Sequence, residues 1–251
     1  MTKKGNPSPE SQIFWKLTIF PKRRMSPNKT FRHNSIKLPE AYSSTDAETG
    51  KRIYTTPDGN KYPSITTVLG ASKGDAIKKW RERIGHEAAT EITKKAASRG
   101  TSLHTIVEHY INNEPIENKG SNISGFIHFK TIQEEVNKID NIILQETAVW
   151  SDYWRIAGRL DCMAQFNGIL SIIDFKTSRK AKPREWIENY FIQGTFYADA
   201  IKERTNGIIC PKQVVIIMAN DDQTFKTYIE PVENWKEGLK NARDRFEEGS
   251  F

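Results

Sequence analysis

The sequence predicts an α/β protein of the mixed α+β kind, with a central mixed β-sheet flanked by helices and a helical region near its N-terminus. Residues from Asp75 to about Asn113 are rich in Ala, Lys, Glu and Arg and contain no proline, which is typical of helix. Three consecutive strand-like segments lie between Ile143 and Lys176, and a helix, two strands and a helix follow. The 251 residues indicate one large core with an appendage, at roughly 150 residues per domain.

The composition excludes several classes of protein. Hydrophobic residues make up 37% and charged residues 27%, which excludes collagen-like and fully disordered chains. The longest purely apolar run is Val214 to Ala219, far short of the roughly 20 residues that a membrane helix needs, so we expect no membrane partner. Cys162 and Cys210 are too few for a disulfide scaffold, a four-cysteine zinc site or a cysteine-ligated iron-sulfur cluster, which favours a reducing compartment.

The basic charge is concentrated at the N-terminus. Met1 to Lys37 contains nine basic residues and one acidic residue, and the remainder is nearly neutral. Residues 1 to about 60 also contain six prolines and show no sustained periodicity, so we predict a basic, loosely ordered arm over 1–60 and a folded domain over 61–251. Two alternatives are a mitochondrial transit peptide, although prolines interrupt its amphipathic helix, and an apolar segment at Ile13 to Phe20 that docks as a strand.

The first helical stretch begins at Gly74-Asp75, which offers an N-cap, and it forms one long helix or two helices broken near Arg99-Gly100. Its basic residues and Trp80 could track phosphates and stack on bases, or they could form a solvated face balanced by glutamates. A second helix is predicted over residues 122–140, where apolar residues recur at mostly helical spacing.

The strands follow in a meander. Ile143 to Trp150, Trp154 to Phe166 and Ile169 to Lys176 are predicted strands, and Asn167-Gly168 between the last two is a strong hairpin signal. Pro183 then opens a helix that ends near Arg204. Strands at 213–219 and 224–229 and a helix at 232–246 complete the chain.

Two acids and a lysine converge in this meander. Asp161 ends the segment Gly158-Arg159-Leu160-Asp161 on the second strand, and Asp174-Phe175-Lys176 lies near the end of the third. Alternate residues of a strand share a face, so Asp174 and Lys176 point together while Phe175 turns into the core. Carboxylates bind hard cations such as Mg²⁺, and a lysine beside them can steer a water molecule or balance phosphate charge. The alternative is a surface ion pair between strands.

Two helical pairs flank these strands. His104 and Glu108 are four residues apart, as are Gln193 and Tyr197, so each pair shares a helix face. Each pair taken alone is equally compatible with a structural role.

In combination, four segments resemble the RecB-like branch of the PD-(D/E)XK nuclease superfamily: Gly100-x-x-x-His104, Gly158-Arg159-x-Asp161, Asp174-x-Lys176-Thr177 and Gln193-x-x-x-Tyr197. The segment Tyr62 to Leu69, followed by Trp80, further resembles the mitochondrial genome maintenance exonuclease group and its phage relatives. The resemblance covers roughly residues 60 to 235 and implies a restriction-endonuclease-like core. Leu160 stands where the superfamily's name has proline, a departure that RecB-like members commonly show.

The resemblance implies roles for individual residues. It makes His104, Asp161, Asp174 and the Phe175 carbonyl metal ligands and Lys176 the catalytic lysine. It also makes Gln193 and Tyr197 a helix motif that supports the site and contacts DNA. Glu146 resembles an additional acid that either binds the metal or anchors water or a basic neighbour. The expected DNA-binding residues are Lys78, Lys79, Trp80, Arg99, Ser64 and Thr66.

These roles imply a metal-dependent DNA exonuclease that uses Mg²⁺ or Mn²⁺ and acts on single-stranded ends in replication, recombination or repair. Replication or recombination proteins are the expected partners besides DNA. A structure-specific or nonspecific endonuclease and a noncatalytic nucleic-acid-binding module are the alternatives. We expect the cytoplasm of a bacterial or phage-infected cell, with the mitochondrion as the alternative.

Overall fold

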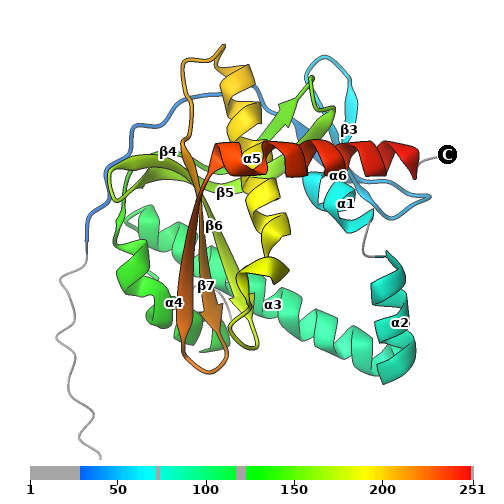
Figure 1. Cartoon of the computed structure of the whole chain (residues 1–251). Helices are drawn as coiled ribbons and strands as arrows, with labels where there is room; N and C mark the ends of the chain where they lie inside the picture. Colours follow the sequence, from blue (N-terminus) through cyan, green and yellow to red (C-terminus); the bar gives the residue numbers. More distant parts are fainter. Residues whose placement is uncertain (1–28, 72–73, 117–122, 250–251) are drawn as a thin grey trace, which may run out of the picture.

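The computed structural model describes residues 29–71, 74–116 and 123–249, and a five-stranded sheet lies at its centre (Figure 1). The spatial order is β4 (Ile139–Ser151), β5 (Ile156–Phe166), β6 (Ile169–Ser178), β7 (Gln213–Asn220) and β8 (Phe225–Pro231). Neighbours run antiparallel except β6 and β7, which are parallel. The predicted mixed α/β class with a central mixed sheet is therefore confirmed, and it is consistent with a restriction-endonuclease-like core.

Helices cover both faces of this sheet (Figure 1). One face packs against α3 (His86–Ile111) and α4 (Ile123–Val136), and the other against α1 (Ile65–Gly70), α5 (Glu188–Arg204) and α6 (Lys236–Glu248). Strand β7 is apolar from Val214 to Ala219 because successive side chains enter opposite cores. Val214 and Ile216 join the α5 side, whereas Val215 and Ile217 join the α3 side.

Two glycines allow the helices to approach closely. A Cβ on Gly194 would lie 2.4 Å from Val214 Cγ1, so α5 can lie directly on β7 only with glycine there. A Cβ on Gly125 would lie 2.0 Å from Ser102 Oγ, where α4 crosses α3. The two glycines thus let α5 pack closely on β7 and α4 pack closely on α3.

The predicted hairpin between β5 and β6 is confirmed. Asn167 and Gly168 both have positive φ, 50° and 82°, which is the two-residue turn that matches the twist of antiparallel strands. Strands β4 and β6 extend beyond their predicted bounds, since β4 begins at Ile139 and β6 ends at Ser178, whereas β5 begins at Ile156 rather than at Trp154. The helix predicted from Pro183 begins instead with a 3-10 turn at Arg184–Trp186, and the closing helix is likewise preceded by one at Val232–Trp235.

Both predicted alternatives for the first helical stretch, one long helix or a break near Arg99-Gly100, are wrong. The chain breaks instead at Gly85, whose φ of 91° separates α2 (Gly74–Ile84) from α3. Gly100 remains inside α3, because a glycine lowers helix propensity by only about 1 kcal/mol and tertiary packing compensates for it. A Cβ on Gly100 would lie 4.0 Å from Thr177 Oγ1, so this part of α3 runs beside the end of β6.

Three strands that the sequence pattern did not predict lie around the predicted domain boundary at residue 61. Strands β1 (Tyr42–Thr45), β2 (Arg52–Thr55) and β3 (Lys61–Pro63) make a small antiparallel sheet. Its Tyr54 packs with Trp150 in a third core. The strands are short and mostly exposed, so their sequence carries little hydrophobic periodicity.

The segment before β1 is also attached to the body. Phe31 is buried in the core on the α3 side, and Arg32 pairs with Asp140. His33 Nε2 lies 2.8 Å from the carbonyl oxygen of Ile111. The apolar segment Ile13 to Phe20 lies outside the described residues, as does most of the basic charge before Lys37. None of the described helices has both the length and the hydropathy to cross a membrane.

Candidate functional site

The site forms where β5 and β6 separate. Cys162 and Ile173 are paired across the two strands, and Asp161 and Asp174 are the next residues beyond this pair. There, the amide of Phe175 donates to Asp161 Oδ2 at 2.9 Å. A carboxylate thus satisfies a backbone donor that the strand ladder no longer pairs. Cys162, on the opposite face of β5, is fully buried, as its alternation with Asp161 predicts.

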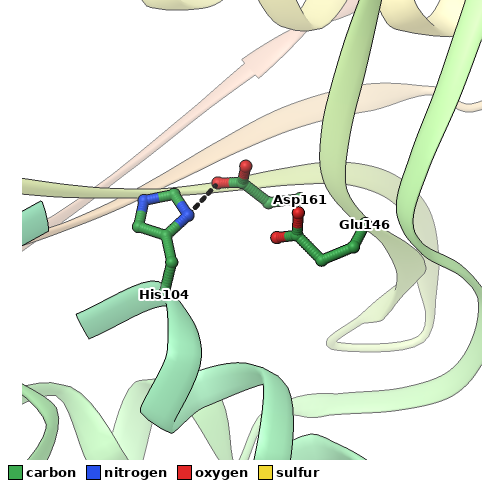
Figure 2. Close-up of side chains that lie close together, drawn as sticks. All are labelled: His104, Glu146 and Asp161. Carbon is green, nitrogen blue, oxygen red and sulfur yellow. Dashed lines mark ion pairs between the residues drawn. The ribbon is translucent and has the colours of Figure 1, made fainter. Parts of the chain in front are cut away.

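Three half-buried side chains could hold a metal ion together. His104 from α3, Glu146 from β4 and Asp161 from β5 point toward one another, and their ligand atoms all lie within 4.8 Å of one another (Figure 2). His104 Nδ1 lies 3.5 Å from Asp161 Oδ2. One imidazole nitrogen and two carboxylates are a donor set that suits a divalent metal ion.

A backbone carbonyl orients the histidine. His104 Nε2 lies 2.7 Å from the carbonyl oxygen of Phe175, and a carbonyl only accepts, so Nε2 is the protonated nitrogen. The other ring nitrogen, Nδ1, faces Asp161 and is the atom that could bind a metal ion. Metal-binding histidines are commonly held in this way. In this structure the Phe175 carbonyl, which the sequence predicted as a metal ligand, accepts a hydrogen bond from His104.

Glu146 is held in an unusual backbone conformation. Its φ of 45° lies in the left-handed region, which costs a residue with a side chain about 1 kcal/mol or more. Arg159 Nη1 donates to the Glu146 carbonyl at 3.0 Å and stabilises this geometry. Burial and the negative charge of Asp161 raise the pKa of Glu146 to about 7. A divalent cation would relieve this repulsion, so the electrostatics fit a metal.

Asp174 and Lys176 form a buried pair beside the three-residue group. Lys176 Nζ lies 2.6 Å from the Asp174 carboxylate, and Asp174 is 3% exposed. Burial raises the pKa of Asp174 to about 6, against the opposing charge of Lys176. Burial opposes the charged lysine, but the charges of Asp174 and Asp161 raise the pKa of Lys176 overall.

The structure keeps Asp174 outside the three-residue metal-binding group, although the sequence predicted it as a ligand. Its Oδ2 atom is buried and makes no well-oriented hydrogen bond to any described residue. That oxygen lies 2.6 Å from Lys176 Nζ in the ion pair, so the lysine ammonium already engages it.

Gln193 and Tyr197 support β5 from the α5 side of the sheet. Both are buried on α5, and Gln193 Nε2 donates to Tyr197 Oη at 3.0 Å. Tyr197 Oη in turn donates to the carbonyl of Arg159 at 2.8 Å, two residues before Asp161. A Cβ on Gly158 would lie 2.9 Å from Tyr197 Cε1, so the Gly-Arg-x-Asp segment needs its glycine to admit this ring. The pair is placed to position Asp161.

The predicted DNA-binding residues do not form one group. Ser64 is buried and caps α1 by accepting from the Thr67 amide, and exposed Thr66 contacts Ser64 Oγ. Lys78 and Lys79 are exposed on α2, which projects from the body (Figure 1), and Trp80 is half-buried there. Arg99 forms an ion pair with Asp221.

Two further residues lie at the site without having been predicted. The ring of Tyr190 lies under Lys176 Nζ, 5.1 Å from its centroid, and accepts at Oη from Lys182 at 3.2 Å. Glu108 lies one turn after His104, and its negative charge helps to raise the pKa of Glu146. The shared helix face of Glu108 and His104 was the signal for the second residue, whereas nothing in the sequence distinguished Tyr190.

Comparison with known proteins identifies low-identity homologues. No protein-family model matches the chain. It is 26% identical over 180 residues to human "Mitochondrial genome maintenance exonuclease 1", covering 65% of this chain and 50% of that protein. The Mus musculus and Xenopus tropicalis proteins of the same name are each 27% identical, over 49% and 57% of this chain and 39% and 44% of theirs. The chain thus spans half or less of each relative, and the homology supports a nuclease enzyme.

Proposed function

We propose that this chain is a metal-dependent deoxyribonuclease that removes nucleotides from DNA ends, with single strands as its substrate. The observation that carries the proposal is the convergence of His104, Glu146 and Asp161, with Lys176 on the neighbouring strand. The homologues' name, an exonuclease of genome maintenance, supports the exonuclease reaction. The motif order supports assignment to the RecB-like branch of the PD-(D/E)XK superfamily.

The site residues divide the work of phosphodiester hydrolysis. His104, Glu146 and Asp161 would hold Mg²⁺ or Mn²⁺, and Asp174, whose carboxylate pairs with Lys176, lies on the neighbouring strand. The bound ion would supply Lewis-acid stabilisation of the charge that develops on the phosphate. Lys176, charged and fixed by Asp174, would orient the attacking water and balance phosphate charge. Gln193 and Tyr197 hold the Asp161 strand in place.

The cellular role follows from the same comparison. DNA replication, recombination or repair are the processes in which removal of single-stranded ends is needed, and proteins of those processes are the proposed partners. The homologues' name favours mitochondria, and the cytoplasm of a bacterial or phage-infected cell is the alternative location.

A digestion of circular and linear single strands tests the proposal. With Mg²⁺ or Mn²⁺, end-labelled linear DNA should be degraded while a covalently closed circle survives, and a chelator should stop the reaction. Lys202→Ala, an exposed lysine near the end of α5, is a control that should retain activity. Cleavage of the circle would favour an endonuclease. Binding without cleavage of either strand would favour a noncatalytic module and refute the proposal.

A further inference from the structure

A basic hollow lies beside α3 on the N-terminal side of His104. It has a volume of about 470 Å³ and is lined by Lys94, Lys95, Ser98, Arg99, Ser124 and Asp221. Arg99 precedes His104 by five residues on α3, roughly 7.5 Å along the helix axis. The amide of Asp221 donates to the carbonyl of Ser178 at 3.0 Å, two residues after Lys176. The hollow is therefore close to the candidate site along both α3 and β6.

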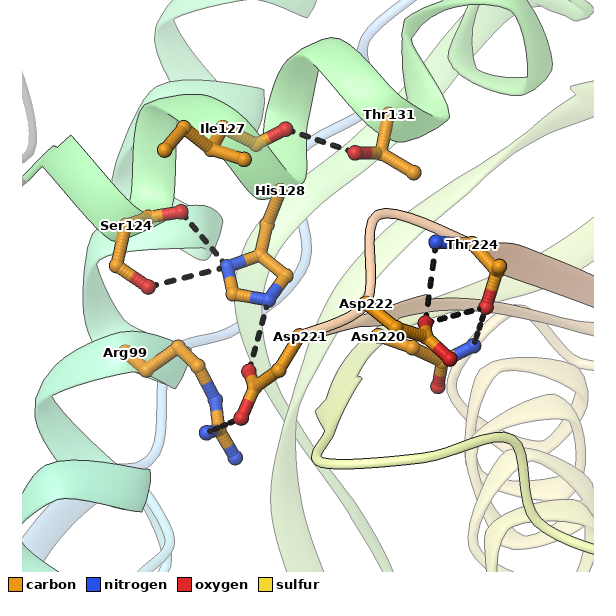
Figure 3. Close-up of polar contacts among 9 residues, drawn as sticks. All are labelled: Arg99, Ser124, Ile127, His128, Thr131, Asn220, Asp221, Asp222 and Thr224. Carbon is orange, nitrogen blue, oxygen red and sulfur yellow. Dashed lines mark hydrogen bonds and ion pairs between the residues drawn. The ribbon is translucent and has the colours of Figure 1, made fainter.

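A chain of polar contacts holds one wall of this hollow (Figure 3). Arg99 Nη1 donates to Asp221 Oδ2 at 3.0 Å, and His128 Nε2 lies 3.1 Å from Asp221 Oδ1. His128 Nδ1 lies 2.7 Å from the carbonyl oxygen of Ser124. The side chains of His128 and Arg99 are only 4% and 15% exposed. The guanidinium is thus fixed before any ligand arrives, which reduces the ordering cost of binding.

The charge of the lining selects the kind of ligand. Three basic residues and two serines accompany one acid, and that acid is already bound to Arg99 and His128. Arg99 Nε is buried and has no hydrogen-bond partner among the described residues. Lys94 is 73% exposed, and its contact with Glu91 is long at 3.9 Å, so little holds its ammonium away from a ligand. A metal cation is disfavoured here, and an oxyanion is favoured.

We infer that this hollow binds a backbone phosphate of the DNA strand whose neighbouring linkage lies at the candidate catalytic site. The inference rests on the proposed function, because it assigns the hollow to the same substrate strand. The two lysines supply mobile charge, while Arg99, held by Asp221, supplies donors at a fixed position. Such a contact fixes the register of the strand without reading its bases.

A series of oligonucleotides, in which one phosphate at a time is made neutral, tests this assignment. Short single-stranded oligonucleotides, each with one neutral methylphosphonate linkage at a different position, are bound to the full chain in chelator, and affinity is measured by fluorescence anisotropy. For the unmodified protein, one linkage should weaken binding about tenfold, as removal of a charge-assisted hydrogen bond implies. In the double variant Lys94→Ala, Lys95→Ala, a neutral linkage at the same position should weaken binding little further. For this double variant, the slope of log affinity against log salt concentration should also be shallower by about 0.7 than for the unmodified protein.

Controls separate this inference from the proposed function. Lys202→Ala lies at a different hollow, near the end of α5, and should retain both the salt slope and the position-specific weakening. Thermal unfolding verifies that the double variant is folded. A weakening that persists undiminished in the double variant, or the absence of any sensitive linkage, overturns the phosphate site. Cleavage with Mg²⁺ is assayed separately, so a strand that is bound in register but never cleaved would refute only the nuclease proposal.

Discussion

Lys176 and Asp174 depend on each other, because the lysine is the principal opposite charge that favours ionisation of a 3% exposed carboxylate. Asp174→Asn and Lys176→Ala should each lower the cleavage rate by about 10²- to 10³-fold or more, since each removes charge at the reacting phosphate. DNA affinity measured in chelator should change much less, because the proposed contacts to the DNA backbone lie at the basic hollow beside α3 rather than at this pair. Single-turnover rates and anisotropy on the same samples measure both quantities. A variant that cleaves at the normal rate would contradict the assigned roles.

Glu146 makes the stability of the metal-free protein depend on pH. Burial, together with the charge of Asp161, raises its pKa from 4.5 to about 7, so the folded state keeps this proton to higher pH than the unfolded state does. The stabilisation is fully present below about pH 4.5 and is lost as pH rises through about 7. In chelator, the melting temperature should fall over this window.

Two comparisons check this origin of the pH effect. Glu146→Gln, which resembles the protonated acid, should weaken the pH dependence, and Mn²⁺ should restore stability at the upper end of the window by mass action. An identical pH profile in the variant would assign the effect to other groups, of which Asp174 is the first to test because its pKa is raised as well.

Strand β5 and helix α5 meet at a contact that tolerates no side chain on Gly158. Gly158→Ala should destabilise the protein by about 1–3 kcal/mol, because the new Cβ would lie 2.9 Å from Tyr197 Cε1. Gly70→Ala is the matched control, since its Cβ would have no neighbour within 4 Å, and its stability should be nearly unchanged. Denaturant titrations give both values. Equal stabilities would mean that Tyr197 is not tightly packed on β5.

Elements with strong periodicity or turn chemistry were predictable from the sequence. The β5–β6 hairpin follows from Asn167-Gly168, whose positive φ values suit those residues. The helix break at Gly85 was missed because an isolated glycine does not reveal its φ, and Gly100 was an equal candidate.

The candidate site likewise combines contacts that local sequence patterns predict with contacts that depend on the tertiary fold. Spacing along β6 predicted that Asp174 and Lys176 would meet. The resemblance also named Glu146 as an additional acid, and the structure brings it to His104 and Asp161, with a left-handed backbone that no sequence pattern indicated. Tyr190 lies against Lys176 through tertiary packing, which no local pattern encodes.

The chain combines a folded body with a basic N-terminal segment, residues 1–28, that lies outside the described residues. Deleting residues 1–28 should flatten the dependence of log affinity on log salt for single-stranded DNA, by roughly 0.7 for each phosphate that the segment neutralises. The cleavage rate at saturating DNA should stay nearly the same. An unchanged slope would count against DNA binding by this segment.

A longer deletion gives the contrasting result. Removing residues 1–37 also removes Phe31, which is 2% exposed in the core, and the Arg32–Asp140 pair. The melting temperature should therefore fall for this truncation, as expected when a buried aromatic residue is removed. Equal melting temperatures for the two truncations would show that packing of Phe31 contributes little.

The single parallel pairing in the sheet has a consequence for the order of folding. Strands β4, β5 and β6 are antiparallel neighbours in sequence, whereas β7 can join β6 only after the crossover through α5 has closed. That crossover delivers Tyr197 to the Arg159 carbonyl, so the Asp161 strand is secured only at this late step. In stopped-flow refolding, Mn²⁺ affinity should therefore recover after most of the circular-dichroism signal has returned. The protein would acquire its proposed metal site last, when the meander that carries both aspartates already exists.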